Sequence, residues 1–357
     1  MIIRSISLRW LKLPLRVPYR LSYRTFTEFE PFYVEITTDT GAVGFGDGHI
    51  SPGSSAETRE GGWQFSQQMA ANLIGRRLDD ATVSVAAKAS ESKVAASAFA
   101  TAIEVTRGIS LLDNPQALSM PLLVPVNNTD PAKIPAEIET LMEQGFRTLK
   151  IKVGKDVDTD LHRVAVIQKA VAGRATLRLD ANRAFNRDQG RRFASALDPE
   201  GIELFEQPCP TDDWEGNAEV ARASTVPLML DEPICSIADI ERAAGVEGVE
   251  LCKLKLKRFG SMTGLHEALN AVRAYGMEPV LGDGLGSDIT SWMETCVARD
   301  TIRNAGEFNG FLKLIDGVLA PRMTFEQGSV ILPAGYRPEV DRDALEHSTV
   351  KHLQFGQ

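Results

Sequence analysis

The chain has 357 residues, of which 43% are hydrophobic and 24% are charged, and its formal net charge is −9. Acidic and basic residues are interleaved, which argues against a nucleic-acid partner, because such proteins concentrate basic residues on one surface. The sequence shows no apolar stretch long enough to span a membrane, so we expect no membrane association. Single cores stop growing at about 250–300 residues, and we therefore expect two domains.

The cysteines lie far apart and form no Cys-x-x-Cys pattern. We therefore expect free thiols in a reducing compartment rather than a disulfide framework or a zinc site. The N-terminus lacks the apolar core of a signal peptide, so we expect a cytoplasmic protein. The cysteines are Cys209, Cys235, Cys252 and Cys296.

The N-terminal third predicts strands followed by helices. Residues 1–50 are rich in β-formers and contain turn signals, which is typical of an antiparallel sheet. Residues 92–109 are alanine-rich and contain no proline, which favours helix. Strands followed by helices indicate an α+β domain, which we place at residues 1–118. A loop at about 16–28 carries several aromatic residues that could close over a ligand.

From Pro121 onward, short apolar strands alternate with helical segments. Eight such β-α units in about 200 residues predict a closed parallel barrel, which we assign to residues 119–322. A doubly wound open sheet is the alternative, but the glycine-rich phosphate-binding turn that it would need is missing after Val126. Residues 323–357 are expected to return to the first domain. The strands are expected at 122–126, 148–153, 176–179, 202–205, 227–230, 250–256, 278–281 and 310–315.

Two lysines lie two residues apart in the second of these strands. Residues i and i+2 of a strand point to the same face, so Lys150 and Lys152 share a face. Two neighbouring ammonium groups lower the pKa of at least one of them, and such a lysine can act as a base near neutral pH. The alternative is an edge strand with two solvated lysines.

Acidic residues end the next three strands. Active sites of parallel barrels lie where strands end, so Asp180, Glu206 and Asp231 are expected to converge. Unpaired carboxylates would repel one another, whereas Mg²⁺ prefers oxygen ligands and would hold them together. The strand ends carry no histidine or cysteine, which argues against zinc. The alternative is that these acids form salt bridges with lysines inside the barrel.

The sixth strand holds three more lysines. Lys255 is expected to approach a bound substrate carboxylate from the side opposite to Lys152. One lysine would remove the proton next to the carboxylate, giving an enediolate whose charge Mg²⁺ stabilises, and the other would return a proton. Lys253 would face the barrel interior as part of an ion pair, and Lys257 would be solvated or lie behind the site.

Five short motifs at these strand ends together resemble the enolase superfamily, and specifically its muconate lactonizing enzyme subgroup. The order and spacing match over most of the chain. The resemblance implies a modified (β/α)8 TIM barrel with an α+β capping domain, to which the N-terminal region and the C-terminal tail both contribute. The motifs are Lys150-Ile151-Lys152, Asp180-Ala181-Asn182, Glu206-Gln207-Pro208, Asp231-Glu232 and Lys-Leu-Lys-Arg-Phe-Gly at 255–260.

The resemblance also implies the role of each residue. Asp180, Glu206 and Asp231 would bind Mg²⁺, for which Mn²⁺ could substitute. Lys152 and Lys255 would be the acid/base pair.

Further residues would support this set. Lys150 would be the charged neighbour that tunes the catalytic lysine of its own strand. Asn182 and Glu232 would support the metal ligands. In the family the catalytic lysine of the sixth strand lies five residues before a glycine, here Gly260, which selects Lys255.

Members of the subgroup catalyse several reactions, so the resemblance leaves the reaction open. We expect an isomerase that racemises or epimerises an amino-acid-derived carboxylate and acts as a homo-oligomer. The alternatives are a cycloisomerase or a syn-dehydratase with the same site. The syn-dehydratase would be a lyase. A non-catalytic barrel that binds a ligand is a more distant alternative.

Substrate contacts are expected from two places. Tyr23 and Arg24 lie in the loop at 16–28, and Asp283 and Gly284 follow the seventh strand. Residues 281–286 partly resemble a Glu-Thr-Gly-Leu-Gly motif of N-succinylamino acid racemases and o-succinylbenzoate synthases. Asp283 could contact a cationic or hydroxylated substrate group, or pair with Lys255.

The region after the expected eighth strand indicates whether the substrate is a dipeptide. Dipeptide epimerases typically carry an Asp-x-Asp pair after this strand, which holds the substrate ammonium. This chain has Lys313-Leu314-Ile315-Asp316 there, which argues against a dipeptide.

Overall fold

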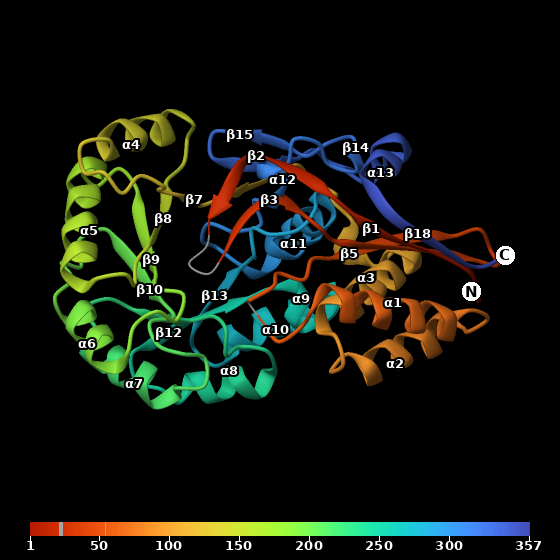
Figure 1. Cartoon of the computed structure of the whole chain (residues 1–357), viewed down its shortest axis with the longest axis horizontal. Helices are drawn as coiled ribbons and strands as arrows, with labels where there is room; N and C mark the ends of the chain where they lie inside the picture. The colour runs from red at the N-terminus through yellow and green to blue at the C-terminus, as the bar shows by residue number, and fades with distance from the viewer. Residues whose placement is uncertain (21–23, 54) are drawn as a thin grey trace.

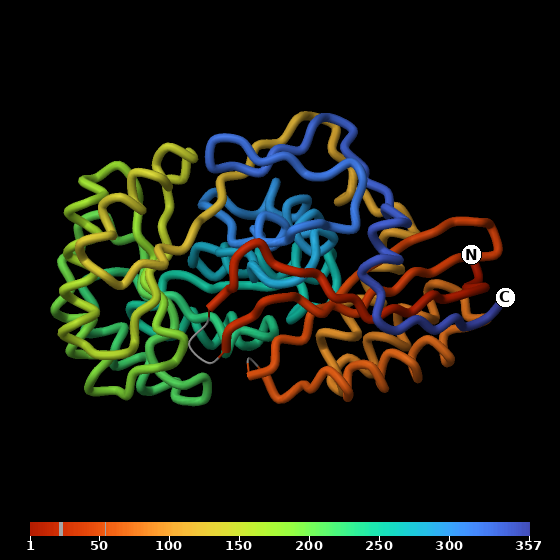
Figure 2. The backbone as a smooth tube through the Cα atoms, turned by 45° about the horizontal axis from the view of Figure 1, so that its top comes forward, coloured from red at the N-terminus to blue at the C-terminus, as the bar shows by residue number. Residues whose placement is uncertain are grey.

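The computed structural model describes residues 1–20, 24–53 and 55–357. A four-stranded antiparallel sheet near the termini forms the capping region together with three helices (Figure 1). Its order is β18-β1-β4-β5, so the last strand of the chain pairs with the first, and Figure 2 shows the two termini close together. The strands are β1 (Ile3–Leu11), β4 (Phe32–Thr38), β5 (Val43–Gly48) and β18 (Thr349–Gly356), and the helices are α1 (Arg59–Leu73), α2 (Leu78–Lys88) and α3 (Lys93–Arg107).

Helix α3 lies directly against β5 because alternate residues of that strand are glycines. A Cβ atom at Gly44, Gly46 or Gly48 would come within 2.3 Å of an atom of α3. Alternate residues of a strand share a face, so these glycines form a flat surface for the helix. The close contact fixes the capping helices against their sheet.

A two-stranded hairpin extends from the capping region toward the barrel. It consists of β2 (Leu13–Arg20) and β3 (Thr25–Phe29). Figure 2 shows this hairpin extending away from the termini, toward the middle of the molecule. Most of the expected loop at 16–28 is therefore strand, and the hairpin is anchored by the buried Leu13, Leu15, Phe26 and Phe29.

The barrel is built on seven parallel strands in the order β13-β12-β11-β10-β9-β8-β7. Helices cover the outside of the strands (Figure 1), which confirms the TIM-barrel prediction. The strands are β7 (Val124–Pro125), β8 (Thr148–Lys152), β9 (Thr176–Asp180), β10 (Ile202–Glu206), β11 (Leu228–Leu230), β12 (Val249–Leu254) and β13 (Glu278–Leu281). The helices are α4 (Ile134–Glu143), α5 (Val157–Val171), α6 (Arg187–Ser195), α7 (Trp214–Ala223), α8 (Ile237–Ala244), α9 (Leu256–Phe259), α10 (Met262–Ala274) and α11 (Asp288–Thr301).

The expected eighth strand at 310–315 is wrong, because residues Gly310–Lys313 form a short helix, α12. An extended segment a few residues earlier joins the two edges of the sheet instead. Gly306 donates to the Pro121 carbonyl at 2.9 Å, and Glu307 donates to the Leu281 carbonyl at 2.9 Å. The prediction failed because a short apolar run does not distinguish a buried strand from one helical turn.

The C-terminal residues contact both parts of the molecule. Strand β16 (Ser329–Leu332) pairs with β15 (Thr324–Glu326) and with β6 (Leu118–Pro121), whereas β18 pairs with β1. The domain boundaries at 118 and 322 remain a prediction. The remaining elements are η1 (Ser110–Leu112), β14 (Leu319–Ala320), β17 (Glu339–Val340) and α13 (Arg342–Ser348).

The four cysteines are free thiols, as expected. Within the described ranges, no helix combines the length and the apolar character needed to cross a bilayer.

Candidate active site

A cavity of about 500 Å³ lies at the C-terminal ends of the barrel strands. All eight residues expected to bind the metal, act as acid or base, or support these groups line it. Tyr19 of β2 and Lys93 at the start of α3 line it from the capping region. The eight are Lys150, Lys152, Asn182, Asp180, Glu206, Asp231, Glu232 and Lys255.

The pairing of the strands brings the functional side chains side by side. Lys152 is the partner of Asp180 in the β8–β9 pair, and Asp180 is the partner of Glu206 in the β9–β10 pair. Asp231 follows β11 directly. The carboxylates therefore share one rim of the barrel, as the strand-end argument requires.

Lys150 lies inside the barrel, with 3% of its side chain exposed. Its Nζ is 2.9 Å from Asp180 Oδ2, from Glu206 Oε2 and from Glu307 Oε2. Burial alone would lower the pKa of Lys150, but these three carboxylates raise it well above its usual value. The surrounding acids, rather than a neighbouring lysine, therefore determine the pKa of Lys150.

Lys152 reaches the cavity, with 30% of its side chain exposed. Its Nζ is 2.5 Å from Asp180 Oδ2 and donates to Asn182 Oδ1 at 2.6 Å. Asn182 has a φ of 45°, and its amide donates to Asp180 Oδ1 at 2.8 Å. This tight turn directs the Asn182 side chain back to the lysine, so Asn182 orients Lys152 as well as Asp180.

Lys255 lies on the other side of the acids, immediately after β12. Its Nζ is 2.9 Å from Asp231 Oδ2, and Arg258 Nη1 is 2.8 Å from Asp231 Oδ1. Burial would raise the pKa of Asp231, but Arg258 and Lys255 hold it well below its usual range. Burial and Arg258 would both lower the pKa of Lys255, but the charges of Asp231, Asp283 and Glu232 together raise it.

Arg258 was missed by the sequence analysis. The strand ends at Leu254 and the short helix α9 follows, so residues 255 and 258 lie one helical turn apart. Residues three apart on a helix are neighbours, and this spacing could have identified Arg258 as a partner of the same carboxylate.

Lys253 forms a buried ion pair, as predicted. Its side chain is 2% exposed, its Nζ is 3.0 Å from Glu206 Oε1, and it also pairs with Glu307. Glu307 was missed because the eighth strand was expected too late in the chain. Burial would raise the pKa of Glu307, but Lys150 and Lys253 lower it to about 2.

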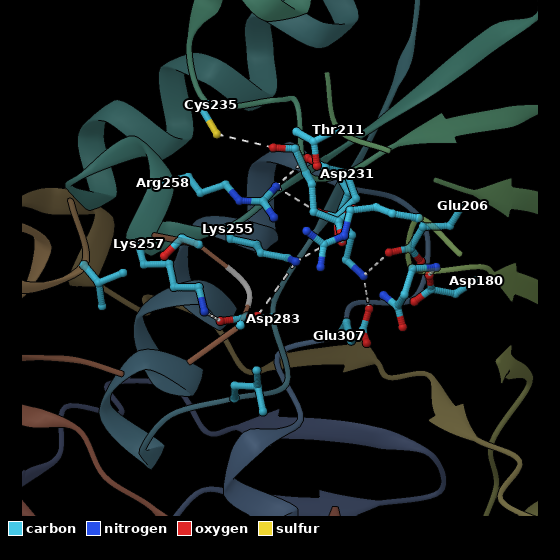
Figure 3. Close-up of a pocket in the computed structure, with 18 of the residues that line it drawn as sticks. Asp180, Glu206, Thr211, Asp231, Cys235, Lys255, Lys257, Arg258, Asp283 and Glu307 are labelled. Atoms are coloured by element: carbon cyan, nitrogen blue, oxygen red, sulfur yellow. Dashed lines mark hydrogen bonds and ion pairs between the residues drawn. The ribbon is translucent and has the colours of Figure 1, made fainter. Parts of the chain in front are cut away.

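Asp283 pairs mainly with Lys257, and the two side chains point toward one another in Figure 3. Lys255 Nζ is 3.9 Å from Asp283 Oδ1, so the expected pair with Lys255 forms as a longer contact. Of the two alternatives for Lys257, solvated or behind the site, the solvated one is wrong, because only 15% of its side chain is exposed and it pairs with this acid.

Glu232 lines the cavity, and its Oε1 is 3.2 Å from Nε of Arg183. Its other carboxylate oxygen is buried and has no hydrogen-bond partner among the described residues. Burial, followed by the charge of Asp231, raises the pKa of Glu232 to about 7. Its contacts involve Arg183 rather than the proposed metal ligands.

Of the remaining expected substrate contacts, the two that the structure describes do not line the cavity. Tyr23 lies outside the described residues. Arg24 is exposed, and its guanidinium lies 5.4 Å from the centroid of the Phe26 ring. The Gly284 carbonyl accepts a hydrogen bond from Lys313 at 2.5 Å. Neither Arg24 nor Gly284 is among the described residues that line the cavity.

The acids fit a hard cation by their chemistry, although basic groups and backbone amides now contact their oxygens. In the part of the chain that the structure describes, no three acidic, histidine or cysteine side chains are arranged to hold a metal ion directly. Asp180, Glu206 and Asp231 are nevertheless buried carboxylates at neighbouring strand ends in one cavity. Mg²⁺ takes such oxygen donors, and it would compete with the lysines for them.

Known proteins share this architecture. Residues 5–107 match the family described as mandelate racemase / muconate lactonizing enzyme, N-terminal domain. Residues 133–338 match the family described as enolase C-terminal domain-like. The L-Ala-D/L-Glu epimerase of Clostridium acetobutylicum is 29% identical over 304 residues, which cover 79% of this chain and 82% of that protein.

Two solved structures share the fold over nearly the whole chain. The N-succinyl Arg/Lys racemase from Bacillus cereus has a TM-score of 0.90 at 22% identity, covering 99% of this chain and 100% of that one. A dipeptide epimerase from Cytophaga hutchinsonii, complexed with Mg and the dipeptide D-Ala-L-Val, has a TM-score of 0.89 at 21% identity, with coverage of 99% and 100%. The chain therefore belongs to the mandelate racemase/muconate lactonizing enzyme family and is an isomerase of the enolase superfamily.

Proposed function

We propose that this enzyme racemises or epimerises an amino-acid-derived carboxylate by moving the proton on the carbon next to that carboxylate. The observation that carries this proposal is the position of two lysines in the cavity. Lys152 ends β8 and Lys255 follows β12, with the acids of the three strands between them. A substrate carboxylate bound beside these acids would have one lysine toward each face.

Exposure separates these two lysines from the other two. The side chains of Lys152 and Lys255 are 30% and 12% exposed, whereas those of Lys150 and Lys253 are 3% and 2% exposed. A base must be within hydrogen-bond reach of the proton that it removes. Only the more exposed pair is therefore suited to contact substrate.

The two lysines exchange roles between the two directions of the reaction. The lysine on the proton side accepts the proton as a neutral amine, and the lysine on the opposite face donates one as an ammonium. Mg²⁺ held by Asp180, Glu206 and Asp231 would offset the charge that develops on the substrate carboxylate and weaken the pull of these acids on the lysines. Asn182 keeps Lys152 directed at the cavity.

Proton exchange in D₂O tests the proposal. The wild-type enzyme with Mg²⁺ should exchange the α-proton of both enantiomers of an N-acylamino acid or dipeptide panel, as followed by proton NMR. A Lys152→Ala variant should exchange only one enantiomer, and Lys255→Ala only the other. Exchange that survives removal of all divalent metal, or replacement of both lysines, would overturn the proposal. An unsaturated or lactone product would instead identify an elimination or a cycloisomerisation.

A further inference from the structure

The segment that carries Lys255 is held by buried acids from two other elements. Lys255 immediately precedes α9, and α9 leads through Gly260 into α10. The first acid is Glu294 of α11, whose Oε1 accepts from the Leu256 amide at 3.0 Å. This bond comes from the barrel itself and fixes the first backbone amide after the lysine.

The second acid comes from the capping region. Glu104 lies in α3 and is only 7% exposed. Its Oε2 accepts from the Met262 amide at 2.7 Å, and its Oε1 accepts from the Thr263 amide at 3.1 Å. These two amides begin α10, where free N–H groups favour a carboxylate. One side chain of a capping helix therefore binds the backbone of a barrel helix about which it has no local sequence signal, since the two lie 158 residues apart.

Helix α3 also contacts α9 directly, and Figure 1 shows the two helices beside each other. A shift of α3 relative to the barrel would therefore move the α9–α10 segment, which carries Lys257 and Arg258 as well as Lys255. Proton transfer depends strongly on placement, because a displacement of about 1 Å in a reacting group can cost about 10²-fold in rate. The position of the capping helix thus bears on the position of one catalytic lysine.

The turn after Lys152 has an equivalent support that comes from the barrel. Asp160, in the first turn of α5, accepts from the amides of Gly154 and Lys155 at 2.8 and 2.9 Å. It belongs to the same β-α unit as the lysine and lies six residues from Gly154. The two lysines therefore have similar carboxylate supports from different parts of the molecule.

We propose that Glu104 is a positioning residue through which the capping region sets the place of Lys255 but not that of Lys152. The inference rests on the proposed function, because that function assigns one lysine to each face of the substrate. Loss of Glu104 should therefore slow proton exchange at one face of the substrate only, whereas a general loss of structure would slow exchange at both faces.

Proton exchange of the two enantiomers in D₂O with Mg²⁺ separates the two faces. The probe is the N-acylamino acid or dipeptide that the wild type exchanges fastest. The enantiomer that Lys255→Ala no longer exchanges reports on Lys255, and the one that Lys152→Ala no longer exchanges reports on Lys152. Glu104→Met should lower the first rate by about tenfold and leave the second within about twofold. Equal losses for both enantiomers, or no loss for either, would overturn the proposal.

Two further variants control this experiment. Glu104→Gln keeps one oxygen acceptor at the same length, so it should lose less of the first rate than Glu104→Met. Glu137 of α4 also accepts from two successive amides, those of Asn127 and Asn128, at 2.8 and 2.9 Å. Glu137→Met removes this matched support within the barrel and should leave the ratio of the two rates unchanged. A change in that ratio as large as in Glu104→Met would contradict a special role of the capping region.

Amide hydrogen exchange tests the support without the reaction. The amides of residues 256–263 should exchange faster in Glu104→Met and Glu104→Gln than in the wild type, while those of residues 152–160 should keep their protection. Melting temperatures would establish that each variant is folded. If the wild type exchanges no substrate proton, the proposed function fails, and this measurement still decides whether Glu104 holds the segment. Unchanged protection of residues 256–263 would overturn the proposal.

Discussion

The barrel holds two layers of lysines, one from each of two pairs that have the same spacing in the sequence. Lys150 and Lys152 lie two residues apart at the end of one strand, and Lys253 and Lys255 repeat the arrangement across the barrel. The inner pair is buried and shares Glu206 and Glu307, whereas the outer pair reaches the cavity. One step of two residues along a strand thus separates a lysine with structural contacts from one placed for proton transfer.

The largest expected effect is on the outer layer. Lys152→Met or Lys255→Met should lower the rate of racemisation by about 10²–10⁴-fold, which is the usual contribution of a general acid–base group. Polarimetry or chiral chromatography would measure the rate. The melting temperature should stay close to that of the wild type, and a large fall in it would show that the outer lysines are structural.

Replacing a lysine of the inner layer should lower the free energy of unfolding. Lys253→Met leaves Glu206 and Glu307 with fewer partners in a buried site, and breaking a buried ion pair costs about 3–5 kcal/mol. Urea unfolding would measure the loss. Lys155→Met is the matched control, because Lys155 is exposed on the loop after β8 and its replacement should change the free energy of unfolding little. Equal stabilities of the two variants would contradict the distinction between layers.

Glu294 is a buried glutamate that pairs with no lysine in the part of the chain that the structure describes, and its pKa is shifted in the opposite direction to that of Glu307. Glu294 lies in α11, its Oε1 accepts from the Leu256 amide at 3.0 Å, and burial raises its pKa to about 8. A raised pKa in the folded state favours the protonated form. Protonated Glu294 therefore contributes stability that is fully present below the unfolded pKa of about 4.5 and is lost as the pH rises through about 8.

The Glu294→Gln variant should not show this loss. Its free energy of unfolding relative to the wild type should increase by a few kcal/mol between pH 5 and pH 9, since each pKa unit corresponds to about 1.4 kcal/mol. Urea unfolding at several pH values would measure the difference. Parallel pH profiles of the two proteins would show that Glu294 does not titrate in this range.

The smallest expected effect concerns the orientation of the outer lysine. Asn182→Ala removes the acceptor at 2.6 Å from Lys152 Nζ and should lower kcat about tenfold without a comparable loss of stability. Steady-state kinetics would measure it. An unchanged kcat would mean that Asp180 alone is enough to position Lys152.

The repeated strand–helix pattern was sufficient to predict seven of the eight barrel strands and the acids at their ends. Strand periodicity placed Lys150 beside Lys152, and local spacing placed Lys253 inside the barrel. The eighth strand, Glu307 and the contacts of Lys257 were missed. Each depends on the residue at which a strand ends, and a short apolar run does not define that residue.

The sequence by itself determined which residue types stand at which strand ends, because alternation along a strand and the order of β-α units are local properties of the chain. Only the tertiary structure decided how deep each lysine lies, since depth depends on the register between strands that are far apart in sequence. It also decided that Gly306 and Glu307 close the barrel, because hydrogen bonds to Pro121 and Leu281 join segments that no local pattern connects. That closure places Glu307 between two lysines, Lys150 and Lys253.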